Sequence, residues 1–360
     1  MLNIIFLFFL ALISFGIGNK ILRLFKVYLD NSLERFVFSF GIGLGVVSYL
    51  TFLLAVLGLL YKWLCLLLLF LLLVISLWGI WKNKGIFSQY KRKIPRSFKL
   101  EKAYIFEYCL LIILSLYILL CFLSALAPPI DWDSLVYHLP IPKIWIQNHK
   151  AIYIPYIVHS ARHLAIQTIY ALGMVILEND TIPCMIIWMS SLWLILCVYT
   201  FCRRYLSPKA GILAMSALYC TPFITAITCK PLVDVPYICY AFLAFYAFYK
   251  YVQSNNYKLL LLSGVLSGFS AASKQFGMIS FVALFLLLIL VELKRKSFIK
   301  KLKYIFLFGF LFVLIIAPWI VRCYIYTGEF FNSSHGGTLL LVGQEEKTKL
   351  KVYSAWSKIG

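Results

Sequence analysis

The sequence predicts an all-α polytopic membrane protein, and three features of its composition support that prediction. Of the 360 residues, 63% are hydrophobic and only 13% are charged, whereas soluble domains average about 45–50% apolar and about 25% charged residues. The apolar residues form long unbroken runs, which is the pattern of helices that cross a bilayer. Despite a formal net charge of +21, the chain lacks the polar surface of a soluble nucleic-acid-binding protein. We therefore expect a lipid bilayer and no nucleic acid among its partners.

Ten apolar runs are candidate membrane spans, so about 10 transmembrane helices are expected. A helix needs about 20 residues to cross about 30 Å of hydrocarbon, and most of the runs reach that length. The eighth and ninth are short; fused, they would form a helix of about 33 residues, so two short helices or a re-entrant hairpin are expected instead. In chain order the runs cover residues 2–18, 36–60, 63–81, 108–127, 181–202, 210–229, 235–249, 259–272, 275–291 and 304–321.

Positive charges predict how the spans are oriented. If the N-terminus lies outside, alternate loops face the cytoplasm, and these loops hold 23 of the 34 Lys and Arg residues. Cytoplasmic loops of membrane proteins carry such an excess. The basic residues nearest the first run follow it, which is typical of an N-out anchor and not of a cleaved signal peptide. We expect a multi-pass protein of a bacterial cytoplasmic membrane, with its N-terminus and its active site on the non-cytoplasmic side.

The outside face collects most of the residues that could do chemistry. This orientation puts all five histidines and eight of the thirteen acidic residues outside, many of them in one long loop at residues 128–180. Ionisable groups near the membrane boundary are functional candidates, although any long polar loop also attracts His and Asp. Residues 134–148 and 163–177 of this loop are apolar and aromatic, so we expect short interfacial helices that lie along the lipid headgroups.

Asp131 and Asp133 open this loop, directly after the prolines that end the fourth span. A carboxylate beside apolar surface has its pKa raised toward the range in which it works as a general base, so Asp133 is the first candidate for that role. Asp133 is also a plausible helix N-cap, because Ser134 and an apolar stretch follow it. Together the two carboxylates form an Asp-x-Asp motif, which could hold a divalent metal next to a phosphate. His138 follows about one helical turn later and is expected to make a structural hydrogen bond.

Lys274 stands alone between the eighth and ninth spans. It is the only charged residue between Lys258 and Glu292, and a lone lysine at a helix break is costly unless it meets an anion. Phosphate is the natural partner, and a lysine solvated at the outer interface is the alternative. Arg322, at the outer end of the tenth span, could bind the same anion or extend its side chain to the interface.

Other residues of the outside face keep their alternatives open. Arg162 and His163 could contact an anionic headgroup or could belong to a solvated face. Asp234 begins the seventh span, where the helix dipole favours an acidic residue. The ten cysteines lie mostly within apolar runs and lack metal-ligand spacing, so they are interpreted as small apolar residues. The sequence also has no glycine motif for binding a nucleotide.

The order of these features resembles the GT-C membrane glycosyltransferases, in the family 39-like branch of protein-mannosyltransferase-like and aminoarabinose-transferase-like enzymes. The features are an outside loop that opens Asp131-Trp132-Asp133-Ser134-Leu135-Val136-Tyr137-His138-Leu139-Pro140, then Asp234, Ser273-Lys274, and Pro318-Trp319 with Arg322 and Tyr326-Thr327-Gly328. The resemblance covers about residues 104–335. It implies an N-terminal three-helix membrane extension at 1–102, a GT-C-like seven-helix catalytic core at 103–327 that carries the loop 128–180, and a polar outside tail at 328–360.

The resemblance also implies a function. Enzymes of this family transfer a sugar, with inversion, from a polyprenyl-phosphate donor to a lipid, glycan or protein acceptor. An acidic residue of the first outside loop acts as general base, and Asp133 matches it best, with Asp131 second. The residues that would bind the donor phosphate are Lys274, Arg322 and Arg162. Those that would bind the substrates are Tyr137, His138, His163 and Asp234.

This chemistry requires no cofactor, although a divalent metal at Asp131 and Asp133 stays open. Two other functions also stay open. One is a transporter or flippase for an anionic lipid-linked sugar, and the other is a polymerase of surface polysaccharide. A transporter more often has paired broken helices in two halves, whereas the sequence indicates only one break, at residues 273–275.

Overall fold

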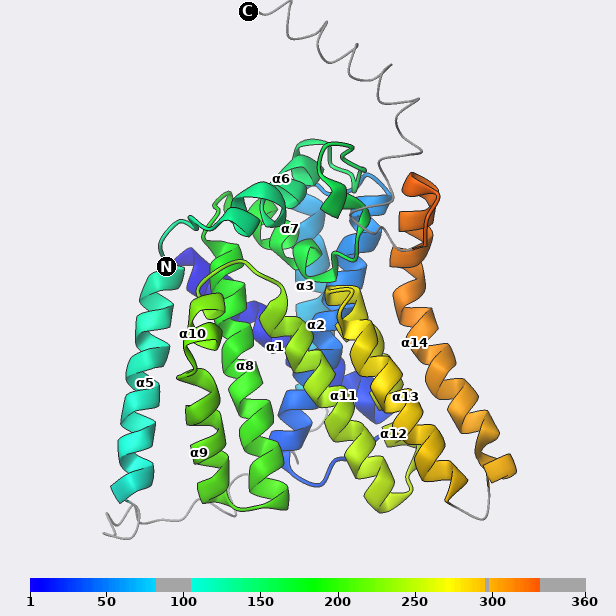
Figure 1. The fold of residues 1–360 in the computed structure, drawn as a ribbon. Helices are drawn as coiled ribbons and strands as arrows, with labels where there is room; N and C mark the ends of the chain where they lie inside the picture. The colour runs from blue at the N-terminus through cyan, green and yellow to red at the C-terminus, as the bar shows by residue number, and fades with distance from the viewer. Residues whose placement is uncertain (82–104, 295–297, 331–360) are drawn as a thin grey trace, which may run out of the picture.

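A computed structural model describes residues 1–81, 105–294 and 298–330 (Figure 1). Within these ranges the chain is helical and contains no strand, so the predicted all-α class is confirmed. The predicted boundary between residues 102 and 103 lies outside the described residues, as does the predicted tail beyond residue 330.

Six helices are long and apolar enough to cross a membrane, or seven if one bent pair is counted as a single span. The prediction of about ten spans is therefore not confirmed. These helices overlap six of the predicted apolar runs, in the expected order. They are α1 (Leu2–Leu24), α2 (Ser32–Val56), α3 (Lys62–Trp81), α5 (Ile105–Ala125), α8 (Ile182–Tyr205) and α14 (Phe298–Thr327).

The bent pair covers the candidate span that was predicted at residues 210–229. α9 (Pro208–Tyr219) and α10 (Pro222–Thr228) meet at an angle of 70°. Pro222 explains the bend, because its ring disfavours the helical conformation in the preceding residue and it has no N–H to donate. Thr221 is accordingly extended, with φ −64° and ψ 125°. The hydroxyl of Thr225 donates to the Tyr219 carbonyl at 2.8 Å, which satisfies a carbonyl at the interrupted end of α9.

Three further helices fall short of the criterion for a membrane span. α11 (Asp234–Ser254) contains many tyrosines and a lysine, while α12 (Tyr257–Ser273) and α13 (Gly277–Leu293) have only 17 residues each. α12 and α13 run antiparallel and are joined by a turn at residues 274–276 (Figure 1), so two short helices form here and not one fused helix. The turn is tight: a Cβ on Gly277 would lie 2.3 Å from the Ser270 carbonyl carbon.

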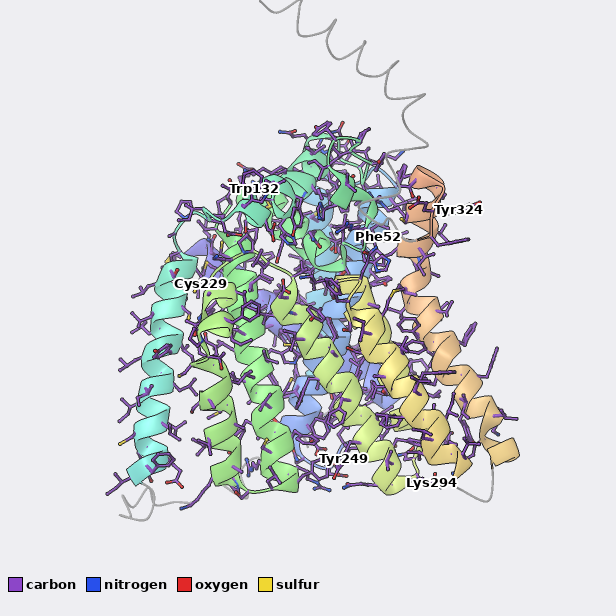
Figure 2. The ribbon with its side chains drawn as sticks, in the orientation of Figure 1. Phe52, Trp132, Cys229, Tyr249, Lys294 and Tyr324 are labelled. Carbon is purple, nitrogen blue, oxygen red and sulfur yellow. The ribbon has the colours of Figure 1, made fainter. Side chains whose placement is uncertain are left out.

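The loops gather at two opposite ends of the helix bundle. At one end the Asn3 side chain donates to Thr181 at 2.9 Å, and Lys62 pairs with Glu178 at 2.6 Å, so the N-terminus shares this end with residues 128–180. Trp132 marks this end in Figure 2, and Tyr249 and Lys294 mark the other. We call the first the loop end and the second the basic end. This grouping of loops follows the alternation that the positive charges predict.

The segment 128–180 is more deeply packed than an interfacial loop. It contains α6 (Pro140–Gln147) and α7 (Ala165–Leu177). α6 is amphipathic, whereas every residue of α7 from 165 to 175 is buried, and α7 packs against α2, α6 and α8. The prediction that residues 163–177 lie along headgroups is therefore wrong. The physical reason is that a helix with apolar side chains on all sides is most stable when neighbouring helices surround it.

Candidate functional site

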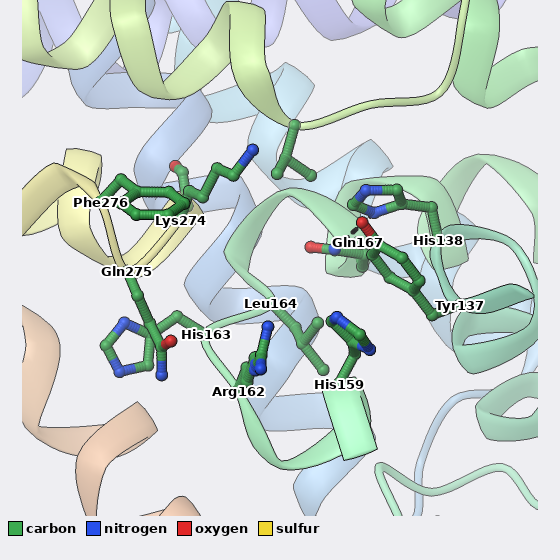
Figure 3. Close-up of a pocket in the computed structure, with 12 residues that line it drawn as sticks. Tyr137, His138, His159, Arg162, His163, Leu164, Gln167, Lys274, Gln275 and Phe276 are labelled. Carbon is green, nitrogen blue, oxygen red and sulfur yellow. Dashed lines mark hydrogen bonds between the residues drawn. The ribbon is translucent and has the colours of Figure 1, made fainter. Parts of the chain in front are cut away.

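A cavity of about 450 Å³ lies at the loop end, where the segment 128–180 meets the turn between α12 and α13 (Figure 3). Its walls come from η2 (Ser134–His138), η3 (Val158–Ala161), the residues that lead into α7, the start of α11 and the turn 274–276. Most of its polar side chains come from elements far apart in sequence. The cavity is lined by Tyr137, His138, His159, Arg162, His163, Leu164, Gln167, Val233, Ser273, Lys274, Gln275 and Phe276.

The structure separates the roles of Asp131 and Asp133. One oxygen of Asp131 accepts from the backbone N–H of Ser134 at 3.2 Å and from its hydroxyl at 2.7 Å. Asp131 therefore caps this helical turn. Asp133 has helical backbone angles and makes no capping hydrogen bond, so the N-cap interpretation of Asp133 is wrong. Its exposed side chain is left available for another role.

Asp133 lies close to the aromatic wall of the cavity. Burial raises the pKa of Tyr137, and the neighbouring carboxylate of Asp133 raises it further. Burial lowers the pKa of His159, as does Arg162, and Asp133 partly offsets both effects. The rings of Tyr137 and His159 stack with centroids 4.0 Å apart. Asp133 therefore lies near these two rings, although it does not line the cavity itself.

His138 and His163 are both buried and hydrogen-bonded. Burial, with a smaller effect of Lys274, lowers the pKa of His138 to about 3, and Nδ1 of this ring lies 3.0 Å from the Gln167 amide nitrogen. Burial likewise lowers the pKa of His163 to about 4. Its Nδ1 lies 2.8 Å from the Ala271 carbonyl oxygen. Both rings are therefore neutral at pH 7, and His138 makes the hydrogen bond that was expected of it.

Lys274 has an anionic partner within the chain. Its ammonium group lies 2.7 Å from an oxygen of Asp234, and both side chains remain partly exposed, at 30% and 21%. The ammonium also lies 5.8 Å from the ring centre of Tyr237 and 5.7 Å from that of Phe276. The carboxylate offsets the cost of placing a lysine at a helix break, so a phosphate is not needed for that purpose. A lysine has three N–H donors, which leaves some for a ligand in the cavity.

Arg322 is placed apart from the other predicted phosphate ligands. Only 6% of it is exposed, and it donates to the carbonyl oxygens of Ser160 at 2.6 Å and Ile152 at 3.2 Å. Its guanidinium lies 5.2 Å from the ring centres of both Trp145 and Tyr326. Arg322 does not line the cavity, whereas Arg162 and Lys274 do. Its contacts attach the segment 152–160 to α14.

Replacing Arg322 by methionine is expected to destabilise the loop end. The change leaves the Ser160 and Ile152 carbonyls without their charged donor, which should lower the free energy of unfolding by about 2–4 kcal/mol. Thermal unfolding of the purified protein in detergent measures the effect. Arg203→Met is the matched control, because Arg203 is exposed. Unchanged stability together with reduced affinity for a lipid phosphate would return Arg322 to the phosphate site.

A bound metal has limited support from the geometry. Among the described residues, no group of three or more His, Cys, Asp or Glu side chains is placed to hold a metal ion. Asp131 already uses one oxygen for its capping contacts. A metal at Asp131 and Asp133 therefore stays a prediction.

Three polar residues of the cavity were not singled out from the sequence. Gln167, Gln275 and His159 line it beside the predicted residues. Gln167 is a polar residue near the start of an otherwise apolar helix, and such a residue is a signal of function in membrane proteins. Gln275 follows directly after Lys274 in the turn. Neutral amides such as Gln167 and Gln275 carry no charge, so the charge pattern of the sequence does not mark them.

Comparison with protein families gives one match. Residues 164–321 match the family described as dolichyl-phosphate-mannose-protein mannosyltransferase, which confirms the predicted resemblance over this part of the chain. The matched range begins just before α7 and includes Asp234 and Lys274, while Asp131 and Asp133 precede it. The match makes this part of the chain similar to membrane glycosyltransferases of the GT-C type. Comparison with curated proteins and with solved structures gave no match.

Proposed function

We propose, from the family match and the cavity together, that the protein transfers a sugar from a polyprenyl-phosphate-linked donor to a lipid, glycan or protein acceptor. The observation that carries the proposal is the cavity at the loop end, because Arg162 and Lys274 bring cations to it from two separate elements. The match over residues 164–321 supplies the reaction class. The excess of basic residues in the other loops supports a loop end that faces the non-cytoplasmic side of a bacterial membrane.

The proposed chemistry is a single inverting displacement at the anomeric carbon. The oxygen of an acceptor hydroxyl attacks the anomeric carbon while the bond between this carbon and the phosphate oxygen breaks. The phosphate oxygen keeps the electron pair of the broken bond. Asp133 takes the proton of the acceptor hydroxyl, as a general base does. Arg162 and Lys274 stabilise the negative charge that develops on the departing lipid phosphate. Attack from the face opposite the leaving group inverts the anomeric configuration.

The other cavity residues hold these groups in position. Asp234 orients Lys274 through their 2.7 Å ion pair. Tyr137, His138 and His163 form part of the cavity wall that would contact the substrates. Arg322 is left out of the phosphate site, because it does not line the cavity and two of its nitrogens donate to backbone carbonyls.

A donor-consumption assay tests the proposal. The full-length protein, reconstituted in liposomes, is supplied with polyprenyl-phosphate mannose and with other polyprenyl-phosphate sugars, in the presence of a bacterial membrane extract as acceptor. Release of free polyprenyl phosphate, followed by mass spectrometry, is expected with at least one donor. Liposomes without protein are the control. No release from any donor in the panel would overturn the proposed function.

Replacing Lys274 by alanine is expected to weaken donor binding about 10- to 100-fold, because a charge-assisted hydrogen bond to phosphate is lost. The affinity of the detergent-solubilised protein for polyprenyl phosphate measures the effect. Lys143→Ala is a close control, because Lys143 also pairs with an aspartate of the loop end, Asp180, at 2.6 Å, but does not line the cavity. Undiminished affinity in Lys274→Ala would remove Lys274 from the phosphate site.

A transporter of lipid-linked sugars is the second candidate function. The sequence indicates one helix break, but the described residues contain two, the 70° bend between α9 and α10 and the turn between α12 and α13. Broken helices are typical of transporters. Movement of a fluorescent polyprenyl-phosphate mannose between the leaflets of proteoliposomes, without any release of free polyprenyl phosphate, would favour the transporter over the transferase.

A further inference from the structure

Four polar side-chain atoms in the cavity wall are buried and have no hydrogen-bond partner among the described residues. They are Nε of Arg162, Nε2 of His163, Oε1 of Gln167 and Nε2 of Gln275. His163 and Gln167 are only 3% and 2% exposed. Buried polar groups in folded proteins are nearly always paired, and each unpaired one has a cost. Four such atoms around one cavity indicate a polar ligand.

The hydrogen bonds of His163 and Gln167 determine what these atoms require. The Ala271 carbonyl can only accept, so Nδ1 of His163 carries the proton and donates to it at 2.8 Å. In a neutral ring the other nitrogen, Nε2, is then an acceptor. The amide nitrogen of Gln167 is directed to Nδ1 of His138 at 3.0 Å, which leaves its oxygen as a second acceptor. Both atoms therefore need hydrogen-bond donors from the ligand.

Three other polar groups of the cavity need hydrogen-bond acceptors from the ligand. Nε of Arg162 and Nε2 of Gln275 can only donate, and the ammonium group of Lys274 also donates. An ionised phosphate can satisfy these three groups, but it has no proton to give to His163 or Gln167. A ligand that satisfies the whole cavity must carry O–H or N–H donors beside an anionic acceptor group. In Figure 3, Lys274 and Arg162 extend from different sides of the cavity, and Gln167 lies between them.

We infer that His163 and Gln167 recognise hydroxyl groups of the transferred sugar, while Arg162, Gln275 and Lys274 bind the phosphate next to it. This inference rests on the proposed function and assigns its sugar-recognition residues. The cavity volume of about 450 Å³ lies within the range of about 300–1,000 Å³ of small-ligand sites.

The test compares two lipids that differ only in the sugar. Wild-type protein in detergent is expected to bind polyprenyl-phosphate mannose more tightly than polyprenyl phosphate. In Gln167→Met and in His163→Phe this preference should fall about tenfold, while the affinity for polyprenyl phosphate stays within about twofold. Gln275→Met is the matched control in the same cavity, because it should lower the affinity for both lipids equally.

The outcomes separate this inference from the proposed function. If wild type binds neither lipid, the proposed function fails, and the inference fails with it. If wild type binds both lipids and the preference for mannose is unchanged in Gln167→Met and His163→Phe, the function stands and the sugar assignment is overturned. If a variant does not fold, the sugar assignment is tested on the wild-type protein alone, with deoxy analogues of the mannose lipid. Equal affinity for the mannose lipid and for its deoxy analogues overturns the assignment, and weaker binding of at least one analogue supports it.

Discussion

The Asp133→Asn variant is expected to transfer sugar about 10²- to 10⁴-fold more slowly than the wild type, because it lacks a general base. Asparagine keeps the size of the side chain and can still hydrogen-bond an acceptor hydroxyl, but it cannot take the proton. Donor binding should be unchanged, since the phosphate and sugar contacts come from other residues. Single-turnover transfer and equilibrium donor affinity, measured on the same preparation, separate the two effects.

The neighbouring carboxylates supply the controls for this prediction. Asp131 is committed to Ser134 through two hydrogen bonds, and asparagine is as good a helix cap as aspartate. Asp131→Asn should therefore lower transfer less than tenfold, and Asp180→Asn, whose partner is Lys143, should have no effect on transfer. Unchanged transfer in Asp133→Asn would remove Asp133 from the base role. Full activity in Asp131→Asn as well would exclude a carboxylate mechanism in this loop.

The helical class and the order of the helices could be predicted because both depend on local sequence. Long apolar runs specify helices without reference to distant residues, and the length that a fused helix would have was enough to predict a break around residues 273–275. The bend at Pro222 is also a local signal, but it was overlooked within an apolar run. The burial of α7 was not predictable in this way. Whether an apolar helix lies against lipid or against protein depends on helices such as α2 and α8, which come from distant parts of the chain.

The sequence predicted several residues of the candidate site, but it did not predict the contacts that these residues make. Lys274 and Asp234 were both selected, yet their 2.7 Å ion pair joins residues 40 positions apart and has no sequence signature. Arg322 was grouped with the phosphate ligands because of its charge. Its partners are backbone carbonyls, which every residue has, so no sequence pattern could reveal them. Gln167 and Gln275 matter through the direction of their hydrogen bonds, which only the fold determines.

The basic end of the bundle holds a buried ion cluster that the sequence did not predict. Lys250 of α11 is 5% exposed and Glu34 of α2 is fully buried. Their charged atoms lie 2.8 Å apart, and Lys250 also contacts Asp30 at 2.7 Å. Tyr246 donates to the second oxygen of Glu34 at 2.7 Å. The cluster joins helices that begin and end far apart in the chain, so its integrity is linked to that of the whole bundle.

Replacing Lys250 by methionine is expected to destabilise the protein by about 3–5 kcal/mol, because it leaves the carboxylate of Glu34 buried without a cation. Unfolding in detergent should occur at a clearly lower temperature than for Lys258→Met, a control at the same end whose ammonium group contacts the exposed carbonyl of Lys26. Adding Glu34→Gln to Lys250→Met should recover part of the loss, since the uncompensated charge is then removed. A Lys250→Met protein as stable as the control would mean that water reaches Glu34. A double variant less stable than Lys250→Met would mean that Glu34 contributes mainly through its hydrogen bond with Tyr246, and not through its charge.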